Sequence, residues 1–589
     1  MHIMRASPTV LFRLALAVLA PLSLAAQVID IRSVAAPPPD VLSLLRLRQQ
    51  EFEGYRREHL PVADLGRGPS GKCDETIGRF CYWYDESSAD VPAEPADITR
   101  ERTRFIAALD SGFRAFPGDR WTAGALVRYL AEAGRTGEAV EVATKCDVRG
   151  WWCPAVRGFA LHAHQRYAAS DSAWTLALRA MDPREACEFR DLKLILDDGL
   201  LRSYRNATCE ERERQERRIW WLARPTLSTS GNDARTEYLS RRLYQKFLED
   251  APSIHSMGFD SDEREMMLRY GWSRAWSRSK GFMPGTRTPV ITGYEPTPAP
   301  PMLPMAETIT NPALSDSIGW RGKGLPGVRS RYSPDHARLL RNLKHQSAIF
   351  RRGDSALVVM AYDVSDDKTL APLAGTDKLS AALALTRGEE GDASVVRLPN
   401  SPARGTLTAM SPWAPMLMSA EVVGAGTSTL SRARYGMRAS EFPTSRVAIS
   451  DLLLFEPYEG MPRRLEDVLP HVSASQVVAE GAKVGIYWET YNTDPTGEGI
   501  QVSITVTPEE KDGSWLRRGL TALKLARESQ PVSVGITDQS ARGRGFTPRA
   551  VVVDLATLKP GRYLMQLEVT ATGTAPVRAE RVITIRAPR

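Results

Sequence analysis

Residues 121–134 read WTAGALVRYLAEAG, and residues 154–167 read PAVRGFALHAHQRY. In both stretches apolar side chains recur every three or four positions, which is the period of an amphipathic α-helix. Three further stretches share this period: residues 102–116, 136–146 and 170–181. Glycine, proline and aspartate separate the stretches, and these residues end helices through their backbone properties. The sequence therefore predicts a domain of short packed helices over residues 101–209.

An internal repeat runs through this helical region. GRTGEA at residues 134–139 recurs loosely as AASDSA at residues 168–173, an offset of 34 residues. Small residues stand where helices would touch, and Pro183 follows the last helix. Over about two repeats this pattern resembles tetratricopeptide repeats. The resemblance implies a helical-repeat module that binds a protein or peptide.

The N-terminus has the features of a secretory signal peptide. Arg5 and Arg13 precede an apolar run from Leu14 to Leu24, and small residues follow. The run is too short for a membrane span, which needs about 20 residues. We predict a signal peptide over residues 1–26 and an exported protein, in the periplasm or outside the cell. No later segment is apolar enough for a transmembrane helix.

All six cysteines lie within the first 209 residues, and residues 210–589 contain none. An even number of cysteines in an exported chain indicates disulfides, although six cysteines allow fifteen connectivities. Pairing sequence neighbours is the simplest arrangement: Cys73–Cys81, Cys146–Cys153 and Cys187–Cys209. Such local bridges would stiffen a short helical array, which lacks long-range contacts.

The first cysteine pair lies in GRGPSGKCDETIGRFCYW, residues 66–83. The glycines and the lysine of GRGPSGK fit a phosphate-binding loop, but Cys73 stands where that motif needs Ser or Thr for magnesium. The residues before it form a poor strand, so we predict no nucleotide site. A zinc site and a reactive thiol are alternatives to a disulfide between Cys73 and Cys81. The exported compartment favours the disulfide.

Overall composition excludes few classes of protein. The chain has 589 residues, too many for one hydrophobic core, so several domains are expected. Lys and Arg number 77 against 70 acidic residues, a net charge of +7 that no basic run concentrates. Nucleic-acid binding therefore has little support.

The residue pattern changes beyond residue 285. Residues 289–333 are rich in proline, glycine, serine and threonine, which predicts a linker. PDHARLLRNLKHQ at residues 334–346 predicts a short helix. Apolar and polar residues then alternate, as in GIQVSITVTP (499–508) and RYLMQLEVTA (562–571), which is the period of a β-strand. Several such strands joined by short turns predict tandem immunoglobulin-like β-sandwiches.

A five-residue motif lies between the helical and the β-rich parts. It consists of Gly258, Phe259, Asp260, Ser261 and Asp262, and the segment after it ends at Tyr270 and Gly271. This stretch resembles the GWxTD family of exported bacterial proteins, with Phe in place of Trp and Ser in place of Thr. The resemblance implies export, a helical part followed by β-rich domains, and a strand that ends at the Tyr-Gly pair. The family has no established reaction, so it implies no catalytic residue.

These features predict a multidomain chain of α plus β class. The expected units are the signal peptide (1–26), an N-terminal segment with the Cys73–Cys81 loop (27–100), the helical repeats (101–209), a GWxTD-like helical and strand segment (210–288), the linker (289–333) and two β-sandwiches (334–444 and 445–589).

Three functions are compatible with the sequence. The first is a non-enzymatic scaffold or binding protein of the bacterial envelope, which acts through its helical repeats on a protein or peptide. The second is an envelope hydrolase or polysaccharide-handling protein that uses Asp260, Asp262 and Glu263. The third is carbohydrate binding by a β-sandwich through Trp488 and Tyr491, although strand alternation places these two on opposite faces. We predict no metal or cofactor, because no metal-ligand or nucleophile motif occurs.

Overall fold

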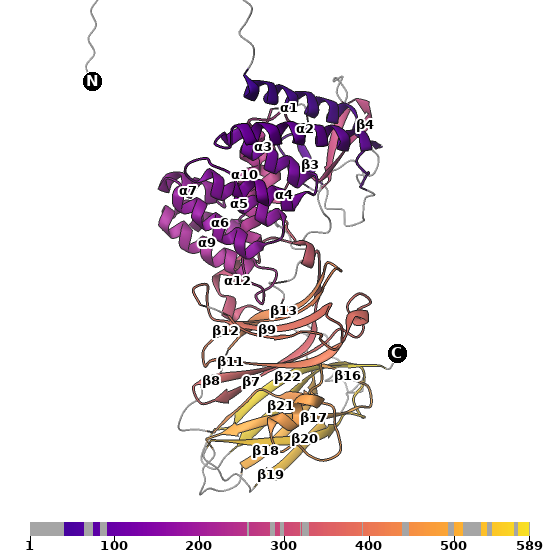
Figure 1. Cartoon of the computed structure of the whole chain (residues 1–589). Helices are drawn as coiled ribbons and strands as arrows, with labels where there is room; N and C mark the ends of the chain where they lie inside the picture. The colour runs from indigo at the N-terminus through magenta and orange to yellow at the C-terminus, as the bar shows by residue number, and fades with distance from the viewer. Residues whose placement is uncertain are drawn as a thin grey trace, which may run out of the picture.

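The structure is a computed structural model, in which helices form one end of the molecule and β-sheets the other (Figure 1). It describes residues 40–63, 75–82, 91–255, 258–282, 289–294, 300–317, 320, 329–391, 393–438, 447–492, 500–509, 532–538, 545–570 and 575–587. The predicted class, helices before sheets, is confirmed. Within these residues no helix is long and apolar enough to span a bilayer.

Eleven helices build the N-terminal end of the described chain. They are α1 (Val41–Glu58), α2 (Ala96–Ala115), α3 (Arg120–Glu132), α4 (Thr136–Thr144), α5 (Trp152–Ala163), α6 (Tyr167–Ala180), α7 (Pro183–Arg190), α8 (Asp198–Asn206), α9 (Cys209–Ala223), α10 (Asp233–Glu249) and α11 (Ser261–Tyr270). The five amphipathic stretches predicted from the sequence correspond to α2 through α6.

The turns before α4 and α6 share one backbone geometry. Gly134 and Gln165 both have positive φ, +73° and +60°. In each turn the next residue donates its N–H to a carbonyl five positions earlier, Arg135 to Leu130 and Arg166 to Leu161. These two turns lie 31 residues apart (134 to 165), whereas the small residues matched in the sequence lie 34 apart.

Helix α10 lies along the surface that α3, α5 and α6 present (Figure 1). Twelve of its 17 residues are buried. The ring of Phe247 meets Trp152 and Phe159 edge-on, at centroid distances of 5.8 and 5.4 Å. The chain thus covers this surface of α3, α5 and α6 with its own helix.

Two of the three predicted disulfides are present among the described residues. Cys146–Cys153 joins the end of α4 to the start of α5, and Cys187–Cys209 joins α7 to the start of α9. Cys81 is also disulfide-bonded. Its predicted partner, Cys73, lies outside the described residues, as does the phosphate-loop-like segment before it.

The segment after the five-residue motif is a helix, so the predicted strand is wrong. Asp262 and Glu263 stand in the first turn of α11 and Arg269 in the last, charges that suit the helix dipole. Buried Glu263, Met267 and Tyr270 follow the helical period. Gly271 ends the helix at φ +91°, a conformation that favours glycine.

A three-stranded sheet packs beside these helices. Its order is β1-β4-β5, and its strands are β1 (Val62–Ala63), β4 (Ala275–Phe282) and β5 (Pro289–Tyr294). Helix α12 (Ala306–Thr310) follows, where the sequence predicted a linker over residues 289–333. Met302, Ile309 and Trp320 from this segment join one apolar cluster with α9 and strand residue Leu417. The described part of the segment is therefore packed between the helices and the sheets.

The first β-sandwich has sheets of order β10-β9-β12-β13-β6 and β11-β8-β7. Its strands are β6 (Leu339–Asn342), β7 (Lys344–Arg352), β8 (Ser355–Asp363), β9 (Leu379–Thr386), β10 (Ser394–Leu398), β11 (Arg404–Pro412), β12 (Met416–Gly424) and β13 (Thr429–Met437). The helix predicted over residues 334–346 is wrong: a short 3₁₀ turn leads into β6 and β7. Pairing of β6 with β13 and of β7 with β8 overrides the local helical pattern.

The second β-sandwich has one sheet with β17 between β20 and the short strands β14 and β15, and another of order β16-β22-β21-β18-β19. Its strands are β14 (Ala448–Ile449), β15 (Leu453–Phe455), β16 (Val477–Ala479), β17 (Lys483–Tyr491), β18 (Ile500–Pro508), β19 (Val532–Asp538), β20 (Phe546–Asp554), β21 (Gly561–Thr570) and β22 (Val577–Arg586). A short helix, α13 (Leu465–Val468), follows β15. The alternating apolar residues of β18 and β21 are buried in the core, as predicted.

Candidate functional site

Two features that the sequence analysis treated separately lie in contact. The hairpin of β2 (Glu75–Ile77) and β3 (Phe80–Tyr82) contains Cys81 and docks against the start of α11. Arg79 at the hairpin tip donates three N–H groups to the Asp262 carboxylate, from its backbone (3.0 Å), its Nε (2.7 Å) and its Nη2 (2.7 Å). A Cβ at Gly78 would lie 2.5 Å from the Cβ of Asp262, so the tip needs glycine. Asp262 is thus a docking residue for the hairpin.

The base of the hairpin is held by the end of α11. Glu75 accepts hydrogen bonds from the Arg269 guanidinium and the Tyr270 hydroxyl. The Tyr82 ring stacks on the Tyr270 ring with centroids 3.8 Å apart. Gly271 lies against the buried Arg241 guanidinium. The Tyr-Gly pair therefore serves packing at the end of a helix.

The remaining motif residues surround Arg79. The Gly258 carbonyl accepts a hydrogen bond from Arg79 Nη2 at 3.2 Å, and Phe259 lies under the Arg264 guanidinium. Asp260 has a side chain 67% exposed and lies 3.3 Å from Arg79. Ser261 is the first residue of α11.

The three acids of the hydrolase hypothesis have different environments. Hydrogen bonds from Arg79 hold the pKa of Asp262 well below its usual range. Burial raises the pKa of Glu263 to about 7, and the Ser253 hydroxyl lies 3.3 Å from its carboxylate. Asp260 faces solvent. Asp262 is therefore held by Arg79, whereas the raised pKa of Glu263 suits proton transfer at neutral pH.

Ser253 and His255 carry no sequence motif, yet Ser253 lies beside Glu263 and His255 lies beside Ser253. The backbone N–H of His255, and not its ring, donates to the Ser253 hydroxyl oxygen at 3.2 Å. Its ring packs edge-on against Phe80 at 5.3 Å, and burial lowers its pKa to about 4. Ser, His and Glu are thus neighbours, but not in the order nucleophile, base, orienting acid that hydrolysis by serine requires.

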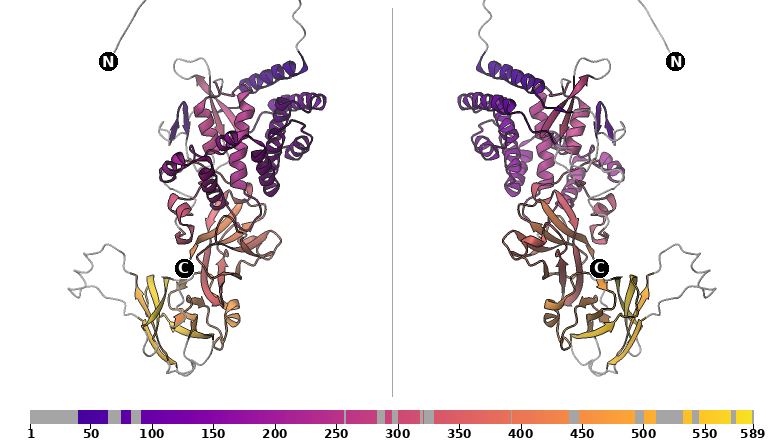
Figure 2. Two further views of the ribbon diagram at one scale, coloured as in Figure 1. Left: turned by 90° about the vertical axis from the view of Figure 1, so that its left-hand side faces the viewer. Right: turned by 90° about the vertical axis from the view of Figure 1, so that its right-hand side faces the viewer.

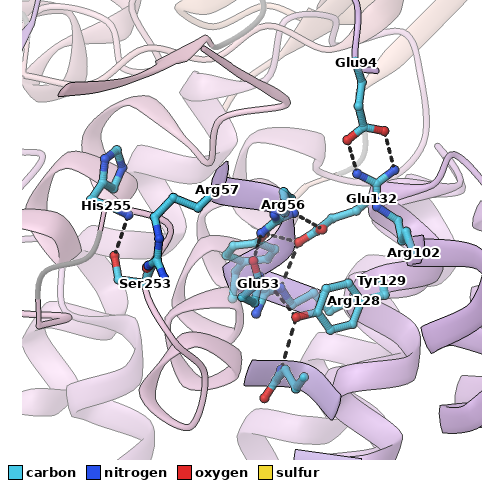
Figure 3. A network of polar contacts seen from close by, with 12 residues as sticks. Glu53, Arg56, Arg57, Glu94, Arg102, Arg128, Tyr129, Glu132, Ser253 and His255 are labelled. Carbon is cyan, nitrogen blue, oxygen red and sulfur yellow. Dashed lines mark hydrogen bonds and ion pairs between the residues drawn. The ribbon is translucent and has the colours of Figure 1, made fainter. Parts of the chain in front are cut away.

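A buried cluster of charges joins α1 to α3, and Figure 3 shows it in the same view as Ser253 and His255. Glu53 and Arg56 from α1 meet Arg128, Tyr129 and Glu132 from α3. Arg56 lies 2.5 Å from Glu53 and 3.0 Å from Glu132. Arg128 lies 3.2 and 2.8 Å from the same two carboxylates, and the Tyr129 hydroxyl donates to Glu53 at 2.6 Å. Each of these side chains is less than 10% exposed.

This charged cluster ties α1 to the rest of the helical region. Burial alone would raise the pKa of Glu132, but Arg128 and Arg56 lower it to about 2, so the carboxylate stays ionised. The Tyr244 hydroxyl of α10 donates to Glu132 at 2.8 Å. Arg57 donates to the Ser253 carbonyl at 3.4 Å, which links the cluster to the motif site (Figure 3). The acids and arginines of the cluster balance each other in charge, and their contacts hold α1 against α3.

The histidines of α5 and of the turn after it have structural partners. His162 bonds with Glu237 (2.7 Å) and Thr236 (2.9 Å), whereas His164 bonds with Thr136 (3.0 Å), so the two imidazoles face different partners. Across the described ranges, no cluster of three or more histidines, cysteines and acids is arranged to bind a metal.

The proposed carbohydrate platform is not exposed. Trp488 is 2% exposed and belongs to the core of the second sandwich. Tyr491 is 5% exposed, and its hydroxyl contacts Glu489 and the backbone N–H of Arg351. Neither ring can stack on a sugar.

Comparisons with known proteins add no family. No protein-family model matches the chain, and no curated protein matches it. Among solved structures, the soluble domain of PmoD from Methylocystis is 9% identical and matches 25% of this chain and 95% of its own, with a TM-score of 0.14. Red sea bream transglutaminase is 8% identical over 42% of this chain and 32% of its own, with a TM-score of 0.13. Dimeric latent PorU from Porphyromonas gingivalis is 13% identical over 45% of this chain and 22% of its own, with a TM-score of 0.19.

Proposed function

We propose that the chain is an exported, non-enzymatic scaffold of the bacterial envelope. In this proposal a helical-repeat module of tetratricopeptide type and two immunoglobulin-like sandwiches form one stiff body that positions envelope proteins. The observation that carries the proposal is that buried charge networks close both junctions between the three parts.

The junction between the helices and the first sandwich centres on Glu421 of β12. Its side chain is 0% exposed and accepts the backbone N–H groups of Leu227 (2.7 Å) and Ser228 (3.1 Å) from the loop between α9 and α10. Arg434 of β13, also 0% exposed, lies 3.3 Å from Glu421 and donates to the Arg224 carbonyl at 2.8 Å. Glu421 and Arg434 lie on neighbouring strands of one sheet, whereas their bonds to Leu227, Ser228 and Arg224 form only when loop and sheet stay together. Opening this junction would leave both buried charges without those hydrogen bonds and is therefore costly.

The junction between the two sandwiches has the same construction. Arg352 of β7 makes two contacts with the buried Glu489 of β17, at 2.6 and 2.8 Å. Gln346 of β7 donates to the Leu454 carbonyl at 2.7 Å and accepts the Leu454 N–H at 3.1 Å. An apolar cluster with residues of both sandwiches surrounds these bonds. The parts are therefore packed against each other and not suspended on linkers.

The position of α10 determines where a partner could bind. Since α10 covers the inner surface of α3, α5 and α6, a protein or peptide partner would bind the outer surfaces of the helical module or the sandwiches. A partner would thus bind surfaces that are already formed, with those of the disulfide-bonded helical module at a fixed distance from those of the sandwiches. This arrangement suits assembly better than enclosure of a peptide in a groove.

Affinity capture from the native envelope tests the proposal. The chain is compared with a variant that carries a flexible glycine-serine insertion after residue 438, between the sandwiches. We expect the stiff chain to retain a multiprotein assembly that the flexible variant loses, and to lose part of it when reductant opens the helical disulfides. Equal recovery by both chains would contradict a scaffold that depends on stiffness.

The hydrolase alternative now depends on Glu263, because the raised pKa of this residue fits acid–base chemistry. Release of reducing ends or peptides from purified cell-wall polymer by the chain, abolished in Glu263→Gln, would favour that alternative over the scaffold.

A further inference from the structure

Residues 330–338 connect the helical end to β6 of the first sandwich (Figure 2). Hydrogen bonds hold this connecting segment against the helices. The Arg241 guanidinium of α10 donates to the Arg331 carbonyl at 2.8 Å. The Gln165 amide, in the turn after α5, donates to the Asp335 carboxylate at 2.6 Å. The segment is therefore part of the junction between the helices and the first sandwich.

Two polar atoms at this contact are buried and have no hydrogen-bond partner among the residues that the structure describes. They are Oδ2 of Asp233, in the first turn of α10, and Nε2 of His336, in the connecting segment. Asp233 is 7% exposed, and the cap of its helix is Asn232, which accepts the N–H of Arg235 at 3.0 Å. Since buried polar atoms in proteins are nearly always hydrogen-bonded, this carboxylate and this imidazole require an explanation.

The rings of Tyr167 and His162 line the contact between α10 and the connecting segment. The Tyr167 ring lies 6.1 Å from the His336 ring and 5.4 Å from the His162 ring. His162 bonds with the Thr236 hydroxyl at 2.9 Å, and that hydroxyl donates to the Asp233 carbonyl at 3.1 Å. Asp233 and His336 thus face the same small group of side chains, one from the helices and the other from the segment.

The Asp233 carboxyl group has an environment that favours its protonated form. Within the described ranges no ion pair joins Asp233 to another residue. Burial raises the pKa of Asp233, whereas the nearby imidazoles of His336 and His162 and the Arg224 guanidinium oppose this rise. Asp233 therefore holds a proton more readily than an exposed aspartate does.

The other ionisable groups at this contact have partners of their own. Glu237 lies 2.7 Å from His162 and 2.7 Å from Arg241. Asp335 pairs with Arg338. Two tyrosines stay protonated because burial raises the pKa of each: Tyr167 and Tyr332. The unpartnered carboxylate and imidazole are thus the pair that is left to exchange a proton.

We propose that Asp233 and His336 share one proton and that loss of this proton to solvent loosens the connecting segment from the helices. The proton lets the carboxylate and the imidazole satisfy each other through one hydrogen bond. When it leaves, the buried carboxylate keeps its charge beside a neutral imidazole, and water competes for both groups. The bonds of Glu421 and Arg434 involve neither group, so this switch does not depend on the proposed scaffold function.

The direction of the pH dependence follows from the shared proton. It stabilises the closed contact below about pH 6.5, where a free imidazole is protonated. This stabilisation is lost as the pH rises from there toward about 8, because the open segment binds the proton less tightly than the closed one.

Hydrogen exchange of the purified chain at about pH 5.5 and pH 8.5, corrected for the intrinsic exchange rate, tests the proposal. We expect amides of residues 330–338 to be about tenfold less protected at the higher pH, which corresponds to a proton bound about one pH unit more tightly in the closed contact. Asp233→Asn and His336→Gln each remove one member of the pair and should abolish this pH dependence. The matched control is His164→Gln, a histidine of the same helical end that bonds with Thr136, and it should keep the pH dependence.

Melting curves check that the variants are folded, and either variant of the pair decides the question if the other fails to fold. Equal protection of the unaltered chain at both pH values, or protection that increases with pH, would overturn the proposal. Persistence of the pH dependence in Asp233→Asn or in His336→Gln would also overturn it. An equal change at the amides of β21 in the second sandwich would count against it as well, because it would show a loss of stability throughout the chain.

Discussion

Replacement of Glu421 by alanine is the sharpest perturbation of the junction between the helices and the first sandwich. Glu421 and Arg434 are both 0% exposed, and the carboxylate also accepts the N–H groups of Leu227 and Ser228. In Glu421→Ala the guanidinium stays buried without its counter-charge, and two backbone donors lose their acceptor. Breaking one side of a buried pair costs about 3–5 kcal/mol, so we expect a loss of that size in the free energy of unfolding.

Urea denaturation followed by tryptophan fluorescence and circular dichroism measures this loss. Glu390→Ala, an exposed acid of the same sandwich, is the control, and it should change stability by no more than about 0.5 kcal/mol. The double variant Glu421→Leu, Arg434→Met also removes the unpaired guanidinium, so it should recover the part of the loss that the buried charge causes, while the N–H groups of Leu227 and Ser228 stay without their acceptor. A loss in the free energy of unfolding below about 1 kcal/mol for Glu421→Ala would show that the carboxylate does not hold the junction.

Three further predictions concern the helical end. Glu132→Gln should destabilise the chain by about 3 kcal/mol at pH 7, since the pKa of Glu132 is lowered to about 2. This contribution is present above pH 4.5 and is lost as the pH falls toward 2, so the melting curves of variant and parent should converge in acid. Asp262→Asn should release the β2–β3 hairpin and raise hydrogen exchange at residues 75–82, whereas Asp260→Asn should not. Glu263→Gln should match the parent near pH 4 and become progressively more stable than the parent between about pH 4.5 and 7. Burial raises the pKa of Glu263 to about 7, so the carboxylate ionises first in the unfolded chain, and the difference is complete above pH 7. An unchanged difference between pH 4 and pH 8 would contradict this.

Local patterns in the sequence were enough to predict the main elements. The five amphipathic stretches became α2 through α6 because each buries apolar side chains at the helical period, although α3 is buried on all sides from Trp121 to Leu130. The alternation in β18 and β21 likewise matched two buried strand faces. Cys146–Cys153 and Cys187–Cys209 join elements close in sequence, so neighbour pairing found them.

Features that depend on distant contacts could not be predicted in this way. Residues 339–342 form a strand because β13 pairs with them from about 90 positions away. Arg79 and Asp262 are 183 positions apart, so the contact between the hairpin and the motif could not be predicted from either segment. The arginines and glutamates of α1 and α3 occur at the spacing of an exposed helix face, yet they are buried against each other. The packing of α10 against α3, α5 and α6 also depends on distant contacts and could not be predicted from local patterns.

The distance between the helical end and the second sandwich shows whether the helices and the two sandwiches form one stiff body. Spin labels carried on unnatural amino acids at Leu176 and Met461, both exposed, leave the native disulfides intact. Pulsed electron resonance should give one narrow distance distribution, which Glu421→Ala broadens. A broad distribution in the unaltered chain, unchanged by that substitution, would show that the parts move independently and would contradict a stiff scaffold.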